Sequence, residues 1–128
     1  MNIQDLLKEH IDNSQIVKDY KKMIYYDASS VNKSDYVLVI RSTGGNGDQY
    51  VRNPSFDLFF VSKEKPNHSQ IQDLGKVADQ VKNYLIENFK YQCIIGIDAG
   101  EVFGPMSASD NRFRYQLNLN LITSGNVL

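Results

Sequence analysis

The sequence predicts an α+β fold, in which an antiparallel-rich mixed sheet of four to five strands carries one long helix, with a short helix at the N-terminus. Residues 69–90 repeat apolar side chains every three or four positions, which is typical of a helix with one buried face. Residues 36–42 and 56–62 are rich in β-branched and aromatic side chains, and residues 112–123 alternate apolar and polar side chains. Both patterns are typical of strands.

Composition sets the broad class of the protein. A length of 128 residues favours one domain spanning 1–128, and 41% hydrophobic with 23% charged residues is ordinary for a soluble globular protein. A net charge of −1 argues against a dedicated nucleic-acid binder. Cys93 is the only cysteine, so no disulfide forms within the chain and no cysteine zinc site exists. We expect no signal peptide and no membrane span, because no apolar run approaches the roughly 20 residues that a membrane helix needs.

The N-terminal region predicts a short amphipathic helix over residues 2–12. Its apolar side chains at helical spacing are Ile3, Leu6, Leu7 and Ile11. Residues 15–26 fit both a helix and a strand, and we expect a helical turn followed by a short strand ending near Tyr26. The polar residues 27–35 predict a loop.

Strand 36–42 and its antiparallel partner 56–62 are joined by a glycine-rich segment, which we expect to be a long flexible connection. Pro54 lacks an amide hydrogen, so the second strand either starts after it or is an edge or bulged strand there. Phe59 and Val61 make this strand apolar on both faces. Such a strand is covered on both sides, by loops or the N-terminal helix, or it awaits a partner.

The long helix is expected to start at Ser69, since Gln72 three positions later completes a capping-box pattern. Gly75 inside this helix costs about 1 kcal/mol relative to alanine, so it is interpreted as a close contact with the sheet.

The C-terminal part predicts a hairpin of strands 91–103 and 112–123. Cys93, Ile95 and Ile97 are expected on one face of the first strand, with a turn or bulge at 98–100. Residues 104–111 predict a turn-rich loop.

The segment Gly44–Gly47 raises the possibility of a phosphate-binding loop. The P-loop pattern needs a lysine and a hydroxyl residue next, and it must open a helix. Neither residue follows here, and the next predicted element is a strand. The segment is therefore predicted to be a hairpin connection rather than a nucleotide site.

No set of residues predicts catalysis, a metal or a cofactor. Asp57, Asp98 and Glu101 show no environment that would separate the pKa values of two carboxyls. His10 and His68 have no partner at metal-ligand spacing. We therefore expect a protein that is not an enzyme.

Four arginines are candidates for an interface. Arg41 and Arg52 flank the glycine segment, and Arg112 and Arg114 share the polar face of the last strand. Two interpretations stay open: ordinary solvated faces, or ion pairs across a subunit interface, where arginine is enriched.

Taken in order, these features resemble the tail terminator and minor capsid proteins of long-tailed bacteriophages and prophages. The cues are an N-terminal helix, the tyrosine-rich Ile24-Tyr25-Tyr26, the strand and turn from Tyr36 to Gly45, the long helix, and Gly104-Pro105 before the closing strand. The resemblance covers nearly the whole chain.

The resemblance implies a subunit that forms a ring with itself, a hexamer, on the end of the tail tube, and carries no catalytic residues. It implies the tail tube protein and the head connector protein as partners, DNA only passing through the ring, and a place in the virion after assembly in the bacterial host cytoplasm. The interface residues that it implies are Arg41, Gly44, Gly45, Asp48, Tyr50, Arg52, Arg112 and Arg114. Two alternatives stay open: a neck or head-completion protein of the same particle, and a small-molecule-binding domain using the glycine segment.

Overall fold

The computed structural model describes residues 2–47 and 51–124, apart from the side chains of 45–47, 51 and 52. The elements in chain order are α1 (Ile3–Asn13), β1 (Lys21–Met23), a 3-10 turn (Ala28–Ser30), β2 (Val37–Gly47), β3 (Val51–Val61), α2 (His68–Glu87), β4 (Ile94–Ala108) and β5 (Arg112–Ser124). The strands form one five-stranded sheet in the order β1-β2-β3-β5-β4. β1 runs parallel to β2 and the other pairs are antiparallel, so the predicted α+β class with a mixed sheet is confirmed.

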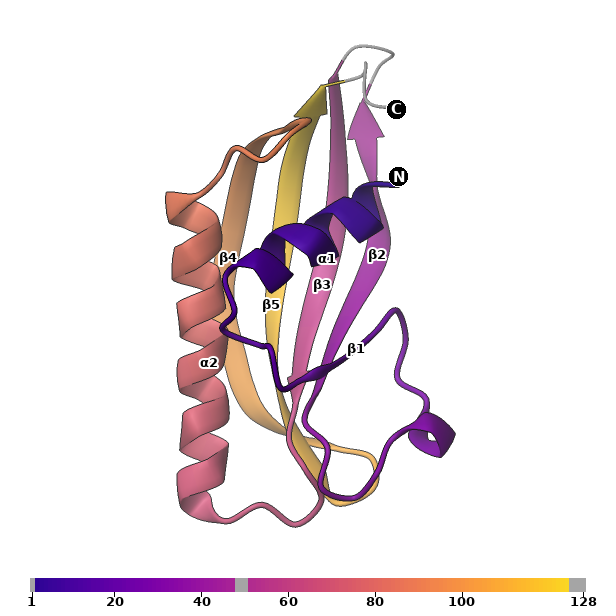
Figure 1. Ribbon diagram of the computed structural model, residues 1–128, viewed down its shortest axis with the longest axis vertical. Helices are drawn as coiled ribbons and strands as arrows, with labels where there is room; N and C mark the ends of the chain where they lie inside the picture. The colour runs from indigo at the N-terminus through magenta and orange to yellow at the C-terminus, as the bar shows by residue number, and fades with distance from the viewer. Residues whose placement is uncertain (1, 48–50, 125–128) are drawn as a thin grey trace.

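Both helices lie on the same face of the sheet, with α2 along the β4 side and α1 crossing the middle (Figure 1). The main core forms between these helices and the sheet. Its largest fully buried side chains include Leu7 and Ile11 of α1, Leu74 and Leu85 of α2, and Phe60 of β3. The opposite face, which we call the open face, carries a smaller cluster of Val37, Val39, Phe59 and Val61.

The long helix begins earlier than the predicted start. The Asn67 side chain accepts a hydrogen bond from the Gln70 amide (2.8 Å), and the Gln70 side chain accepts one from the Asn67 amide (2.9 Å). The prediction of Ser69 and Gln72 as the capping box was wrong because Asn67 and Gln70 have the same spacing and cap the helix first.

The prediction of a close contact at Gly75 is confirmed. A Cβ atom at Gly75 would lie 2.8 Å from Cζ of Tyr115 on β5. The ring of Tyr115 is also confined by Gly104 of β4, where a Cβ would lie 2.8 Å from Cδ2. Tyr115 therefore fills the space between α2 and β4, and Gly75 lets the helix approach it.

The glycine-rich segment is not the long loop that the sequence predicts. Gly44 to Gly47 continue β2, and β3 already begins at Val51, so Gly45 pairs with Pro54. The ladder is irregular between Ser42 and Gly44, where Gly44 has φ +99°. The expectation for Pro54 was therefore wrong: β3 begins before Pro54 and lies between β2 and β5, and the extra residue of the bulge is in β2, not in β3. As a result, β2 and β3 extend past both helices at the top of Figure 1.

The C-terminal hairpin is confirmed, but β4 is longer than predicted. The expected irregularity at 98–100 is present as a register shift between Ala99 and Val102. Residues 104–108 are strand rather than loop, with a further shift between Phe103 and Met106 at the cis Gly104–Pro105 bond. A third shift between Ile94 and Gly96 leaves Ile95 46% exposed, so its predicted place beside Cys93 and Ile97 was wrong.

His10 connects the two helices. Its ring stacks on Tyr91 (centroids 4.4 Å apart), and Nε2 lies 2.7 Å from the carbonyl oxygen of Asn88, just after α2 ends. Because a carbonyl only accepts, Nε2 carries the proton. At 3% exposure, this histidine is a core residue that joins α1 to the end of α2.

We expect His10→Ala to lower the free energy of unfolding by about 2–3 kcal/mol, since both the ring contact and the hydrogen bond are lost. His10→Phe keeps a ring and loses only the hydrogen bond, so about 1 kcal/mol is expected. Chemical denaturation of both variants measures the difference. Equal stability of the two variants would contradict the role of the ring contact, and a His10→Phe variant as stable as the parent would contradict the role of the hydrogen bond.

Candidate protein interface on the open face of the sheet

The open face is built from side chains that lie opposite one another across four strands. One row runs from Val39 through Phe59 and Gln116 to Phe103, and the next contains Arg41, Asp57 and Asn118. Directly opposed residues in a sheet point to the same side, so these rows place apolar and charged groups together. The face is therefore apolar and cationic toward β2 and β3, and amide-rich along β5.

Two arginines cover Phe59. The guanidinium carbon of Arg41 lies 4.8 Å from the ring centroid and that of Arg114 lies 4.9 Å away. Arg41 also pairs with Asp57 (Nη2 to Oδ2, 2.7 Å). Arg114 makes no ion pair within the described part of the chain, and its buried Nε atom has no hydrogen-bond partner there. Phe59 thereby stays only 7% exposed although no helix covers it.

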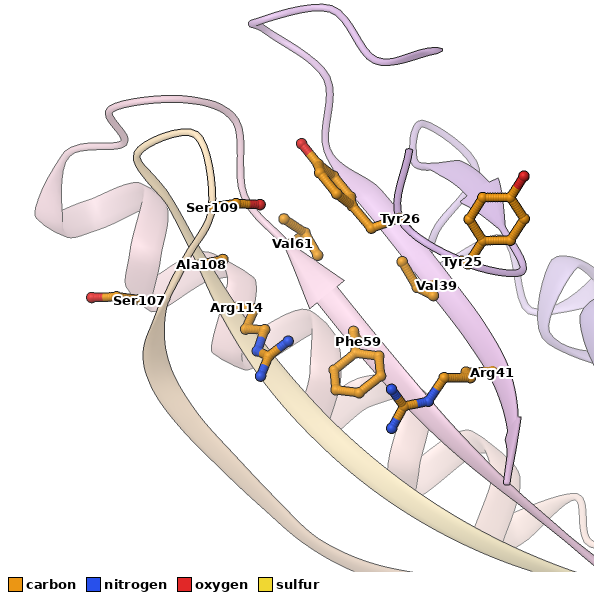
Figure 2. A pocket seen from close by; sticks show the side chains of 10 residues that line it. All are labelled: Tyr25, Tyr26, Val39, Arg41, Phe59, Val61, Ser107, Ala108, Ser109 and Arg114. Atoms are coloured by element: carbon orange, nitrogen blue, oxygen red, sulfur yellow. The ribbon is translucent and has the colours of Figure 1, made fainter. Parts of the chain in front are cut away.

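A hollow of about 340 Å³ lies beside this pair of arginines (Figure 2). We call it the arginine groove. Its floor and its cations come from β2, β3 and β5, one wall comes from the segment after β1, and the other comes from the end of β4 and the turn that follows it (Figure 2). The lining residues are Tyr25, Tyr26, Val39, Arg41, Phe59, Val61, Ser107, Ala108, Ser109 and Arg114.

One wall residue of the groove is fixed by a hydrogen bond. Tyr26 Oη donates to Asp110 Oδ2 (3.2 Å), which ties the segment after β1 to the β4–β5 turn. Burial raises the pKa of Tyr26, and so does the hydrogen bond to Asp110, so the hydroxyl remains a donor at neutral pH.

Arg112 does not belong to this face. It is 2% exposed, and its guanidinium donates to the carbonyls of Asp35 (2.7 Å), Ser62 (2.9 Å) and Asn32 (2.8 Å). The interpretation of Arg112 as a solvated residue, grouped with Arg114, is therefore wrong. The alternation of β5 is correct for Arg114, but at the strand's first residue the segment before β2 and the residue after β3 enclose the side chain.

The other predicted interface residues lie near the end of the β2–β3 hairpin. Gly44 and Gly45 are in β2, where Gly44 is exposed, and the backbone of Arg52 pairs with Gly47 and Thr123. Asp48 and Tyr50 lie outside the described residues. Because Gly44–Gly47 is strand, it forms no cradle for phosphate, and the small-molecule hypothesis loses the feature on which it depended.

The carboxylates considered for catalysis are separated. Asp57 pairs with Arg41, and Glu101 reaches Lys82 at 3.6 Å, while Asp98 lies opposite Asn120. Over residues 2–47 and 51–124 no group of histidine, cysteine and acidic side chains is placed to hold a metal ion. The arrangement on the open face suits binding, through cations above an apolar floor.

The residues that form the walls of the groove could not be identified from the sequence. Tyr25, Tyr26, Ser107 and Ser109 come from segments far apart in the chain, and no spacing in the sequence links them. The one available signal was the apolar pair Phe59 and Val61, which marked the face but not what surrounds it.

The chain was compared with known proteins and family models. A search of curated proteins finds no match to the chain. Within the described residues, no helix has the length and apolar character needed to cross a membrane. The family model described as "Phage tail termination protein" matches residues 1–125. The chain therefore belongs to the phage tail termination protein family, a structural family of the phage tail.

Proposed function

We propose that this protein forms a ring of six copies at the end of the phage tail tube, stops polymerisation of the tube and offers a surface to the head connector. As a member of a phage tail family, it is a component of the virion. Its place is the junction between tail and head, reached after assembly in the cytoplasm of the bacterial host. Its partners are further copies of itself, the tail tube protein and the head connector protein, and DNA only passes through the ring.

The open face is the observation that carries the proposal. Both helices cover one side of the sheet, and only the segment around β1, through Met23, Tyr26 and Val31, packs on the apolar cluster of the other side. The apolar cluster itself is at most 7% exposed, so the open face offers a partner its arginines, the amides of β5 and the exposed Phe103, and arginine and aromatic side chains are enriched at protein interfaces.

The strand edges support the same proposal. β1 pairs only with Val37–Val39, so in the described structure β2 has no strand on its outer side from Ile40 to Gly47. β4 is the outermost strand on the opposite side. Two different edges on one subunit fit head-to-tail contacts, which close into a ring when the rotation permits.

Electron microscopy of particles made without this protein tests the proposal. We expect abnormally long tails, because nothing stops the tube. Supplying the protein in trans is the control and should restore the normal length. Full heads beside free tails of normal length would instead identify a neck protein and overturn the terminator role.

Shortening the β2–β3 hairpin tests whether its end is needed for assembly but not for folding. Replacing residues 46–53 by Asn-Gly joins Gly45 to Pro54 through a two-residue turn that suits a hairpin. We expect the free energy of unfolding to stay within about 1 kcal/mol of the parent, since every core residue that the structure describes lies outside 46–53, and we expect control over tail length to be lost. Normal tails with this variant would refute a role for the hairpin tip.

A further inference from the structure

We infer that the arginine groove of one subunit receives the carboxylate of Glu101 from β4 of a neighbouring copy. This inference rests on the proposed ring and names the charge pair that joins its subunits. The contact is head-to-tail: the groove faces one neighbour, and β4, at the far edge of the sheet, faces the other.

The groove is built to accept an anion. Arg114 has no ion pair among the described residues, and its Nε is buried without a partner. The nearby acids are already engaged, Asp57 with Arg41 and Asp110 with Tyr26. Hydroxyls at the walls come from two serines and a tyrosine. An incoming carboxylate would give Arg114 the ion-pair partner that it lacks, since a guanidinium prefers paired oxygen acceptors.

The wall of the groove sets a second requirement. The Tyr25 side chain is 65% exposed there and offers aromatic surface to an occupant, whereas Val39, Phe59 and Val61 of the floor are already buried, at no more than 7% exposed. The occupant should therefore carry an apolar side chain close to its acidic one, so that both parts of the groove are filled on binding.

Glu101 meets both requirements. Its side chain is 86% exposed, and its one described ion pair, to Lys82, is long at 3.6 Å. It lies within the irregularity between Ala99 and Val102 on the outermost strand. Phe103, which is 54% exposed, follows two residues later, about 6–7 Å along a strand.

Two other exposed acids fit less well. Glu87 has the exposed Ile86 and Phe89 nearby, but Lys90 lies over the Phe89 ring (5.7 Å) and would meet Arg114 with a like charge. Asp98 has Gly96 and Gly100 two positions away on either side, so it brings no apolar side chain with its carboxylate.

Charge reversal of the full-length protein tests the pair. We expect R114E and E101R each to raise the concentration needed for ring formation at least about tenfold, because like charges then meet at every contact. Analytical ultracentrifugation with tail tubes present measures this, and E87R is the matched control, expected to assemble as the parent does. Circular dichroism confirms that each variant is folded.

Mixing the two single variants gives the decisive result. In a 1:1 mixture, the new carboxylate at position 114 of the R114E subunit meets the new guanidinium at position 101 of the E101R subunit. At the next contact around the ring, the unchanged Arg114 meets the unchanged Glu101. An alternating ring of six then closes, so the mixture should assemble within about threefold of the parent concentration, which is under about 1 kcal/mol. The double variant R114E/E101R should do the same.

The outcomes separate this inference from the proposed function. Single variants that assemble normally, or variants that neither mixing nor combination rescues, would overturn the charge pair while leaving the ring intact. A parent protein that forms no ring and leaves tail length unchanged would overturn the proposed function, and the inference with it.

Discussion

Arg112→Met is expected to lower the free energy of unfolding by about 3–5 kcal/mol. The guanidinium is buried and holds the carbonyls of Asn32, Asp35 and Ser62, which belong to the segment before β2 and to the end of β3. Methionine fills much of the volume but donates no hydrogen bond, so each of the three carbonyls loses a donor, although that of Asn32 still accepts from the Asp35 amide. Denaturant unfolding followed by circular dichroism gives the value.

Two matched variants show whether the loss comes from these hydrogen bonds. Arg112→Lys keeps the charge but loses the planar fork that serves several acceptors at once, so we expect an intermediate loss of about 2–3 kcal/mol. Arg114→Met, two residues along the same strand, removes a guanidinium that lies over Phe59 and should cost about 1 kcal/mol or less. Equal losses for Arg112→Met and Arg114→Met would contradict the role assigned to Arg112.

Gly75→Val is expected to destabilise the fold by about 1–3 kcal/mol. Even one added carbon would lie 2.8 Å from the Tyr115 ring, and that ring is held from the other side by Gly104. The larger side chain must therefore push α2 away from β4 and β5 or force Tyr115 out of its position. Overpacking of this kind commonly costs about 1–3 kcal/mol, and the higher helix propensity of valine relative to glycine offsets only a few tenths of a kcal/mol of that cost. Thermal and denaturant unfolding both measure the change.

A second substitution, at Tyr115, isolates the effect of the contact between residue 75 and the Tyr115 ring. In a Tyr115→Leu background the space next to residue 75 is open, and Gly75→Ala should then stabilise the protein by up to about 1 kcal/mol through helix propensity. In the parent background the same Gly75→Ala change should be destabilising. The same effect of Gly75→Ala in both backgrounds would show that Tyr115 does not restrict this position.

The sheet and the two helices could be predicted because each has a local pattern. The alternation in residues 112–123 and the three-to-four spacing in α2 arise because one side of each element faces the core. Both patterns can be recognised even when the predicted ends of the element are wrong by a residue or two. The capping box was misplaced because the spacing of Asn67 and Gln70 repeats at Ser69 and Gln72, and only the path of the chain before the helix selects between them.

The irregular strands could not be predicted in the same way. A single bulge reverses the side to which later residues point, so the shift between Ile94 and Gly96 turned Ile95 toward solvent. The glycine segment is strand because β3 pairs with it over its whole length, a partner that local propensity does not reveal.

The sequence by itself determined the α+β class, the absence of a phosphate-loop pattern and a strand apolar on both faces, since each depends on the type and order of neighbouring residues. Only the tertiary structure determined the burial and the hydrogen bonding of the two arginines of β5. Arg112 is enclosed by carbonyls from loops about 80 residues away, while Arg114 lies over Phe59 with an unpartnered nitrogen. The physical reason is that burial and hydrogen bonding are set by segments distant in the chain, so two arginines with the same local pattern acquire different roles.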